Sequence, residues 1–357
     1  MDELRSLRTS AVGRAGRRDA PTPDPPAVML TGVGKRYDIV SCFAALSTVV
    51  AVDPNPLAPA RYAAQMRATA PRIEDPAYVP ALRELCEQHG VGAVLPLTDL
   101  DIEVLALARE RGELPALVPS SQVARATYDK YEAHLLLERL GLPSPPTVLP
   151  GADLDALRYP VMVKPRQGSG ARSIHLAHDA MQARFFVDYV EEPTMIQRAM
   201  GGPELSIDCL GDLDGRCLNA IPRTMLESRG GESIKGTVID DPELVELGRR
   251  AMEALAVRGP ATIQVFRDPE LGVRITDVNT RFGGAFPAPT LAALPGCSYP
   301  ELIVRMARGE PVEPHVGEYR RDVTFTRYYW QLELDGQLAP NGKDILPAGP
   351  PGPPVPK

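Results

Sequence analysis

A lysine at the end of an apolar strand, followed by a loop with two glycines, is the first feature of the sequence that could bind phosphate. In residues 161–173, Lys164 follows Val-Met-Val, and Gly168 and Gly170 come shortly after it. Glycines let backbone N–H groups approach phosphate oxygens, and the lysine adds a positive charge. The alternative is an ordinary turn with a solvated lysine. The segment is not a Walker A loop, because the spacing G-x-x-x-x-G-K-[ST] occurs nowhere in the chain.

A second cluster of polar residues lies near the end of a later strand. Asp277, Asn279 and Arg281 alternate along residues 274–281, so an extended chain places them on one face. Gln264, on the preceding expected strand, adds a third oxygen. Carboxylate and amide oxygens suit Mg²⁺, and a guanidinium beside them suits a phosphoryl group in transfer. The alternative is a polar strip that faces solvent.

The elements that must position these residues fall into two patterns. Before residue 121, short apolar strands alternate with helices, which predicts a parallel sheet with helices on both faces, a Rossmann-like domain over residues 27–120. The expected strands are 28–30, 48–52, 92–95 and 117–119, and the expected helices are 37–45, 84–89 and 100–111.

After residue 121 the strands are expected to pair in an antiparallel manner beside helices, an α+β arrangement. We predict a small lobe with the glycine-rich loop over residues 121–192 and a larger lobe with the metal site over residues 193–335. The expected helices are 128–140 and 242–257, and the expected strands are 160–164, 174–177, 195–198, 204–210, 216–222, 261–266 and 272–278.

The two ends and the composition bound the environment of the protein. Residues 1–26 are rich in Arg and Pro and residues 336–357 in Pro, so both are expected to be disordered. The net charge of −7 argues against nucleic-acid binding. Apolar runs are too short for a membrane span, and no signal segment follows Met1, so we expect a cytoplasmic protein.

Cysteine usage agrees with a reducing compartment. The five cysteines show no C-x-x-C spacing, which argues against a disulfide framework or a structural zinc site. Because dimers are the commonest soluble oligomers, a homodimer is the expected assembly.

The order of these polar residues resembles the ATP-grasp superfamily, most closely the branch around the large subunit of carbamoyl-phosphate synthase. The resemblance covers about residues 28–309. Its most specific stretch is N-T-R-F-G-G at residues 279–284, close to that branch's N-P-R-F-G-G, and Gly231-Glu232-Ser233 is similar to its G-D-S segment.

The resemblance implies a fold of class α/β plus α+β: an N-terminal Rossmann-like parallel sheet followed by a two-lobed ATP-grasp fold, with ATP between antiparallel sheets. Lys164 and Arg281 would act on the transferring phosphate and Arg281 also on the acyl phosphate. ATP would be bound by Lys130 and Lys164 at the α- and β-phosphates, by Gly168, Ser169, Gly170 and Ala171 over the β- and γ-phosphates, by the backbone of Gln197, Arg198 and Ala199 at adenine, and by Glu204 at ribose. Mg²⁺, with Mn²⁺ as an alternative ion, would be bound by Gln264, Asp277 and Asn279.

Three positions depart from the family pattern. Gln197 stands where a Glu is commoner, Asp277 is shorter than the usual Glu, and Thr280 replaces Pro. A Gln at position 197 carries no charge, and the shorter side chain of Asp277 implies a metal that is displaced or bridged by water. No glutaminase domain and no second synthetase half are present, which argues against carbamoyl-phosphate synthesis itself.

The segment 223–238 reads as a polar loop that would face the second substrate. Arg223, Glu232 and Lys235 are its candidate substrate contacts, and the alternative is a plain surface loop. Gly283 and Gly284, next to Arg281, are further candidates.

The function expected from these residues is an ATP-dependent carboxylate–amine ligase. It would activate an amino acid or another small acid as an acyl phosphate and form an amide, releasing ADP and phosphate; its partners would be a small-molecule carboxylate and an amine. Phosphorylation of bicarbonate or carbamate, and noncatalytic ATP binding, are the alternatives. An NAD(P)-dependent oxidoreductase built on Gly32-Val33-Gly34 is a further alternative, although Tyr37 occupies the place of the third glycine of that fingerprint.

Overall fold

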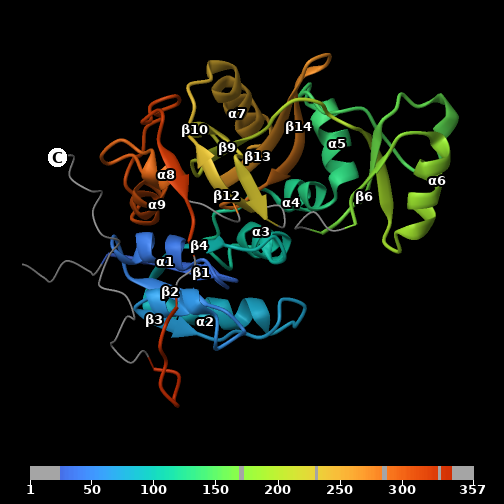
Figure 1. Ribbon diagram of the computed structural model, residues 1–357. Coiled ribbons are helices and arrows are strands. Elements are labelled where there is room, and N and C mark those ends of the chain that lie inside the picture. The colour runs from blue at the N-terminus through green and yellow to red at the C-terminus, as the bar shows by residue number, and fades with distance from the viewer. Residues whose placement is uncertain (1–24, 169–172, 230–231, 284–287, 329–330, 340–357) are drawn as a thin grey trace, which may run out of the picture.

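A parallel four-stranded sheet forms the N-terminal part of the protein. The computed structural model describes residues 25–168, 173–229, 232–283, 288–328 and 331–339, so the arm and the tail predicted at the two ends lie almost wholly outside the described residues. The strands lie in the order β3-β2-β1-β4 (Figure 1). Their bounds are β1 (Ala27–Thr31), β2 (Val49–Val52), β3 (Met66–Ala68) and β4 (Val91–Pro96), all parallel.

Helices cover both faces of this sheet, as its nearly continuous apolar strands predict. On one face, α2 (Tyr78–His89) and α3 (Ile102–Glu110) pack against Met29 and Val94. On the other face, α1 (Tyr37–Ala44) and the distant α9 (Tyr299–Ala307) pack against Leu30 and Leu95. A 3₁₀ turn, η1 (Pro59–Ala63), follows β2.

The strand predicted at residues 117–119 was wrong, whereas the helix predicted at 128–140 was confirmed. The first segment forms no strand: parallel pairing with β4 stops after one bridge, Val94–Ala116, just before Pro119, which has no N–H to donate. The predicted helix is α5 (Lys130–Arg139), and α4 (Ser121–Tyr128), which precedes it, was not predicted. They separate at Asp129, whose extended backbone and side chain cap α5 through the N–H of Tyr131.

A second sheet forms the small lobe that Figure 1 shows beside α6. It is antiparallel, in the order β5-β8-β6-β7. Val161, Val163 and Ile196 point to the face covered by α6, so the alternate residues of β6 and β8 face the other way. The elements are β5 (Thr147–Val148), η2 (Leu154–Ala156), β6 (Val161–Pro165), β7 (His175–Ala177), α6 (Ala180–Tyr189) and β8 (Thr194–Arg198).

The largest sheet is antiparallel, in the order β10-β9-β13-β14. One face packs against α7 (Pro242–Ala254), where Gly248 allows close approach: a Cβ there would lie 2.8 Å from Ile207 Cγ2. The opposite face carries polar side chains at one end. The strands are β9 (Glu204–Gly211), β10 (Cys217–Thr224), β13 (Gly259–Asp268) and β14 (Gly272–Asn279).

The polar loop predicted at 223–238 was wrong. Arg223 is the last residue but one of β10, and the residues after this strand form a hairpin that pairs with a later strand in a three-stranded sheet, β11-β12-β15. The Thr residues of this segment suit strands, and the polarity of the segment concealed the hairpin. The bounds are β11 (Glu227–Arg229), β12 (Glu232–Thr237) and β15 (Thr324–Thr326); α8 (Ala288–Leu291) precedes α9.

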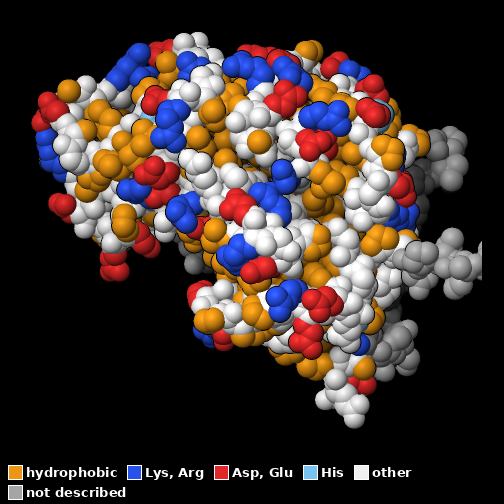
Figure 2. Space-filling model, turned by 180° about the vertical axis from the view of Figure 1, so that it is seen from behind, with side chains coloured by type: hydrophobic (Ala, Val, Ile, Leu, Met, Phe, Trp, Pro, Cys, Tyr) orange, Lys and Arg blue, Asp and Glu red, His pale blue; other side chains and the backbone are white. Residues whose placement is uncertain are grey.

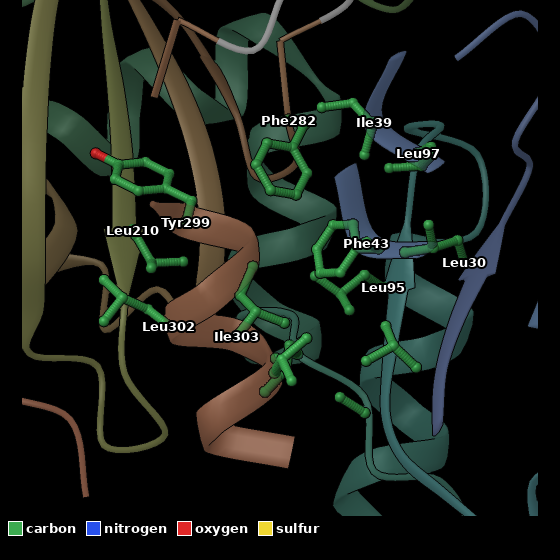
Figure 3. Close-up of a cluster of buried hydrophobic side chains, with 14 of the residues drawn as sticks. Leu30, Ile39, Phe43, Leu95, Leu97, Leu210, Phe282, Tyr299, Leu302 and Ile303 are labelled. Carbon is green, nitrogen blue, oxygen red and sulfur yellow. The ribbon is translucent and has the colours of Figure 1, made fainter. Parts of the chain in front are cut away.

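One apolar cluster joins the parallel sheet to the largest sheet. Figure 3 shows Leu30 and Leu95 on the side of the parallel sheet, Leu210 on the side of β9, and Leu302 and Ile303 of α9 with the Phe282 ring between them. The predicted domain boundaries remain predictions. One apolar cluster contains residues from both sides of the boundary predicted at residue 120.

Three sequence-level statements can be compared with the described residues. All five cysteines are free thiols. No helix in the described ranges is long and apolar enough to cross a membrane. Figure 2 shows Lys and Arg side chains interspersed with Asp and Glu across the described part of the face drawn, in place of the continuous basic surface that nucleic acid requires.

Candidate active site

Lys164 lies on the face of the small lobe that turns away from α6. It is buried, and its Nζ donates to Gln197 Oε1 at 2.9 Å. Gln197 in turn donates through Nε2 to Thr147 Oγ1 at 2.9 Å. A Gln therefore orients the lysine without neutralising it, which gives a physical role to the uncharged residue that departs from the family pattern.

The second lysine is fixed at the root of the glycine-rich loop. Lys130 is the first residue of α5, and its Nζ donates to the carbonyl of Gly168 at 2.6 Å. The backbone N–H of Lys130 donates to Arg166 O at 2.8 Å, and Arg166 pairs with Asp129 at 2.7 Å. The start of α5 and the start of the loop are thus held together. Ser169, Gly170 and Ala171 lie outside the described residues.

Charges from both lobes converge on Lys164. Burial lowers the pKa of Lys164 to about 8; the carboxylates of Asp277 and Glu204 act to raise this pKa, and Lys130 acts to lower it. Burial, and then the charge of Asp277, raise the pKa of Glu204, while Arg223 and Lys164 oppose that change. Such effects require short separations, so these side chains share one space. Residues of the small lobe and of the largest sheet therefore meet across it.

Three oxygen-bearing residues lie on the polar face of the largest sheet. Gln264 of β13 is directly opposite Asp277 of β14, and Asn279 Nδ2 donates to Asp277 Oδ2 at 3.1 Å. No group of three or more His, Cys, Asp or Glu in the described ranges is arranged to hold a metal ion. One carboxylate with two amides still fits Mg²⁺, which takes few protein oxygens and completes its shell with phosphates and water.

Arg281 follows β14 and points toward the carboxyl end of the parallel sheet. Its Nη2 donates to Asp99 Oδ2 at 2.6 Å and lies 3.3 Å from Asn279 Oδ1, while Nη1 donates to Phe282 O at 2.9 Å. Three acceptors thus fix the guanidinium, and one of them, Asn279, is a candidate metal ligand.

The strand end proposed to recognise adenine is already hydrogen-bonded through its amides. Arg198 N–H donates to Pro146 O at 2.9 Å and Ala199 N–H to Pro160 O at 3.0 Å. The backbone amides of Arg198 and Ala199 are therefore already used within the protein and cannot bind the adenine edge without losing these bonds. The Arg198 side chain pairs with Glu270 at 3.2 Å.

The substrate candidates on the hairpin do not share one environment. Arg223 is buried on β10, where its Nε donates to Asp208 Oδ2 at 2.6 Å. Lys235 is exposed and pairs with Glu227 at 2.5 Å. The side chain of Glu232 lies outside the described residues, as does Gly284.

Gly283 has a packing reason to be glycine. A Cβ there would lie 2.9 Å from Thr262 Oγ1 and 3.5 Å from Asp208 Oδ1. Thr262 donates to the same carboxylate at 2.8 Å, so Asp208 is the centre of a buried network that supports the site.

Sequence reasoning missed Asp99, Asp129, Thr262 and Asp208. Asp208 and Thr262 alternate with apolar residues along β9 and β13, and this polar alternation was the available signal. Asp99 lies in a loop, and nothing in its neighbourhood of the sequence points to Arg281.

Comparison with known families matches two parts of the chain. Residues 28–115 match the family described as PylC-like, N-terminal domain, and residues 190–328 match the family described as ATP-grasp in the biosynthetic pathway with Ter operon.

Individual proteins agree with these matches. A D-alanine–D-alanine ligase of Kineococcus radiotolerans is 28% identical over 279 residues, 63% of this chain and 74% of that protein. A formate-dependent phosphoribosylglycinamide formyltransferase of Solidesulfovibrio magneticus is 31% identical over 153 residues, 40% of this chain and 37% of that protein. The biotin carboxylase of Campylobacter jejuni, solved as an ATP complex, has a TM-score of 0.66 at 16% identity, over 84% of this chain and 74% of that chain, which is a likeness of fold.

Proposed function

We infer that this chain, which belongs to the ATP-grasp superfamily, is an ATP- and Mg²⁺-dependent ligase that joins a carboxylate to an amine. The residue assignments are supported by the charge effects that Lys130, Glu204 and Asp277 exert on buried Lys164, because these residues come from two lobes. Two ammonium groups and two carboxylates so arranged suit a triphosphate with a divalent ion.

In the first proposed step, an oxygen of the acid attacks the γ-phosphorus in line, and the bond to the β–γ bridging oxygen breaks, so that ADP leaves. Lys164 and Arg281 offset the charge that gathers on the phosphoryl oxygens. Mg²⁺, held by Gln264, Asp277 and Asn279 together with phosphate oxygens, would neutralise charge on the β- and γ-phosphates. Lys130, at the start of α5, binds the phosphates on the side opposite to Mg²⁺.

In the second step, the nitrogen of the amine attacks the acyl carbon, phosphate leaves, and the nitrogen loses a proton to form the amide. Water must be kept away from the acyl phosphate, because hydrolysis would waste it. We propose that the small lobe, which carries Lys164 and the start of the glycine-rich loop, covers the phosphates and excludes water.

The test is a screen of amino acids and other small acids, singly and in pairs with amines, in the presence of Mg·ATP. ADP and phosphate should appear together with a product whose mass equals acid plus amine minus water. Bicarbonate is included alone: phosphate release with bicarbonate and no amine would favour carbamate-type chemistry. Release of AMP in place of ADP would contradict the acyl-phosphate mechanism.

We further propose that the protein works as a cytoplasmic homodimer. The basis is the prevalence of symmetric dimers among soluble oligomers and the free thiols of the chain. Light scattering coupled to gel filtration should give a mass of two chains, and a single-chain mass at working concentration would contradict it.

A further inference from the structure

Arg36 is a buried arginine whose guanidinium is only partly hydrogen-bonded. It precedes α1, and its side chain is 5% exposed. Its Nε lies 3.4 Å from Asp38 Oδ1, whereas Nη1 and Nη2 have no hydrogen-bond partner among the described residues. Leaving buried charged donors unpaired is costly, and a carboxylate or phosphate is the group that satisfies two guanidinium nitrogens at once.

Other cations surround Arg36. Burial is the largest influence that lowers its pKa; Asp38 opposes that change, and the charges of Arg281 and Arg327 add to it. Both arginines are therefore near enough for their charges to act on Arg36. Asp38 lies beside Arg36, and Asp99 pairs with Arg281. A carboxylate or phosphate beside Arg36 would fill its two unused donors.

The position of Arg36 in the sheet is one where α/β proteins bind ligands. The order β3-β2-β1-β4 places β2 and β4 on opposite sides of β1, so the chain leaves the carboxyl ends of β1 and β4 in opposite directions. Such a switch point opens a crevice outside the strand ends. Arg36 lies in the loop after β1, and Asp99 in the loop after β4.

The packing of α1 holds Arg36 against the catalytic side. The rings of Phe43 and Phe282 lie 6.1 Å apart, edge to face, and Figure 3 shows Ile39 beside them. Because Phe282 follows Arg281 directly, this ring contact ties α1 to the segment of the arginine assigned to the phosphoryl group.

We propose that Arg36 binds an anionic group of a substrate, a carboxylate or phosphate other than the carboxylate that is phosphorylated, in the crevice between the loops after β1 and β4. The inference rests on the proposed function. Bidentate pairing engages both oxygens of a carboxylate and withdraws charge from them, which suits an anchor and not the attacking group. One substrate therefore carries an additional negative group: a dicarboxylic or phosphorylated acid, or an amino acid acting as the amine.

The first experiment measures anion binding with the nucleotide site already filled. The wild-type protein is saturated with Mg²⁺ and the nonhydrolysable analogue AMP-PNP, and succinate or inorganic phosphate is then titrated while the unfolding temperature is followed. Sodium chloride at matched ionic strength is the control. Succinate or phosphate should raise the unfolding temperature beyond the effect of sodium chloride, because a ligand of the native state stabilises it. No such rise in the wild type overturns the inference.

Variants assign the binding to Arg36. Arg36→Gln should weaken the apparent anion affinity by about 10- to 100-fold, the loss expected for charge-assisted hydrogen bonds. Arg158→Gln, which removes an exposed arginine paired with Glu270, should leave the affinity unchanged. Arg36→Lys keeps the charge but loses the two-pronged geometry, and should bind more weakly than the wild type. It also serves if Arg36→Gln does not fold, and wild-type affinity in either Arg36 variant overturns the inference.

The two proposals fail in different ways. If AMP-PNP with Mg²⁺ gives no stabilisation, the proposed function fails; if the nucleotide binds but the anions do not, only the role of Arg36 fails. Once the screen finds a substrate pair, Arg36→Gln should raise KM for the substrate that carries the second anion. Converting that anion to an amide should raise KM for the wild type by a similar factor and leave KM for Arg36→Gln almost unchanged. An equal rise in KM for both proteins would overturn the assignment.

Discussion

The guanidinium of Arg281 lies 2.6 Å from the carboxylate of Asp99, although 182 residues separate them in the chain. The contact connects the loop after β4 in the parallel sheet to the end of β14 in the largest sheet. Asp99 therefore orients the arginine that we assign to the transferring phosphate.

Asp99→Asn should lower kcat by about 10-fold or more and leave the Kd for Mg·ATP almost unchanged. The charge-assisted hydrogen bond that orients Arg281 is worth about 1.5–3 kcal/mol, and each 1.36 kcal/mol is about a factor of ten in rate. Asp155→Asn, which removes the partner of Arg184 in an exposed ion pair, is the matched control. A normal kcat in Asp99→Asn would show that Arg281 needs no such support.

Lys164→Ala should slow turnover by about 10- to 150-fold and weaken binding of Mg·ATP, because it removes a charge-assisted contact to the phosphates. Steady-state kinetics and calorimetry give the two effects separately. Arg249→Ala on the exposed side of α7 is the comparison and should behave as wild type. Unchanged turnover and ATP affinity in Lys164→Ala would remove this lysine from the site.

The affinity for Mg·ATP should fall as the pH rises above about 8. Burial lowers the pKa of Lys164 to about 8, so the free protein loses this positive charge as the pH passes that value, and the phosphates then lose an attractive partner. Binding near pH 8.5 should take up protons, because the bound phosphates favour the charged lysine. Calorimetry in two buffers of different ionisation enthalpy measures this uptake, and Lys164→Met should abolish it; equal uptake in the variant would assign the proton to another group.

The same lysine has a smaller effect on folding. Its folded pKa is below the value of 10.5 for an exposed lysine, so the charged form is disfavoured in the native state. The penalty is fully present below about pH 8 and fades as the pH rises toward the unfolded pKa. The contribution of Lys164 to the free energy of unfolding should thus become more favourable between those values, which urea unfolding of wild type and Lys164→Met can compare.

Arg223→Met should destabilise the fold by about 3–5 kcal/mol, because it leaves the buried carboxylate of Asp208 without its cation. Urea unfolding measures the loss. If Arg223 also binds substrate, KM for the acid or the amine should rise at temperatures where the variant is fully folded. A variant with unchanged stability and a raised KM would show that Arg223 binds substrate and is not needed for folding.

Much of the fold could be predicted because apolar periodicity is local. The strands β1, β2, β4, β6, β8, β9, β10, β13 and β14 and the helix α7 were predicted close to their observed bounds. The hairpin β11–β12 was missed because its residues are mostly polar, so it lacks the apolar alternation that marks a buried strand. The helix α4 was missed because it is short and buries only Ala124, so its apolar periodicity is weak.

The sequence predicts which residues form the candidate site, but it does not predict the contacts between site residues that lie far apart in the chain. Lys164, Asp277 and Asn279 stand out because polar residues end apolar strands. Asp99 and Arg36 do not, since each acquires its role from a neighbour far along the chain, and only the packing of α1 and α9 brings those neighbours together. Local sequence carries no record of that packing.

The shared apolar cluster sets a limit on recombination. A chimera that exchanges residues 27–120 for the corresponding segment of another protein would replace the side chains against which α9 and Phe282 pack. This would happen even though each sheet is kept whole. A chimera that folds would have to exchange residues 282 and 299–307 together with the N-terminal segment. The part of this protein that can be exchanged as a unit is therefore discontinuous in sequence.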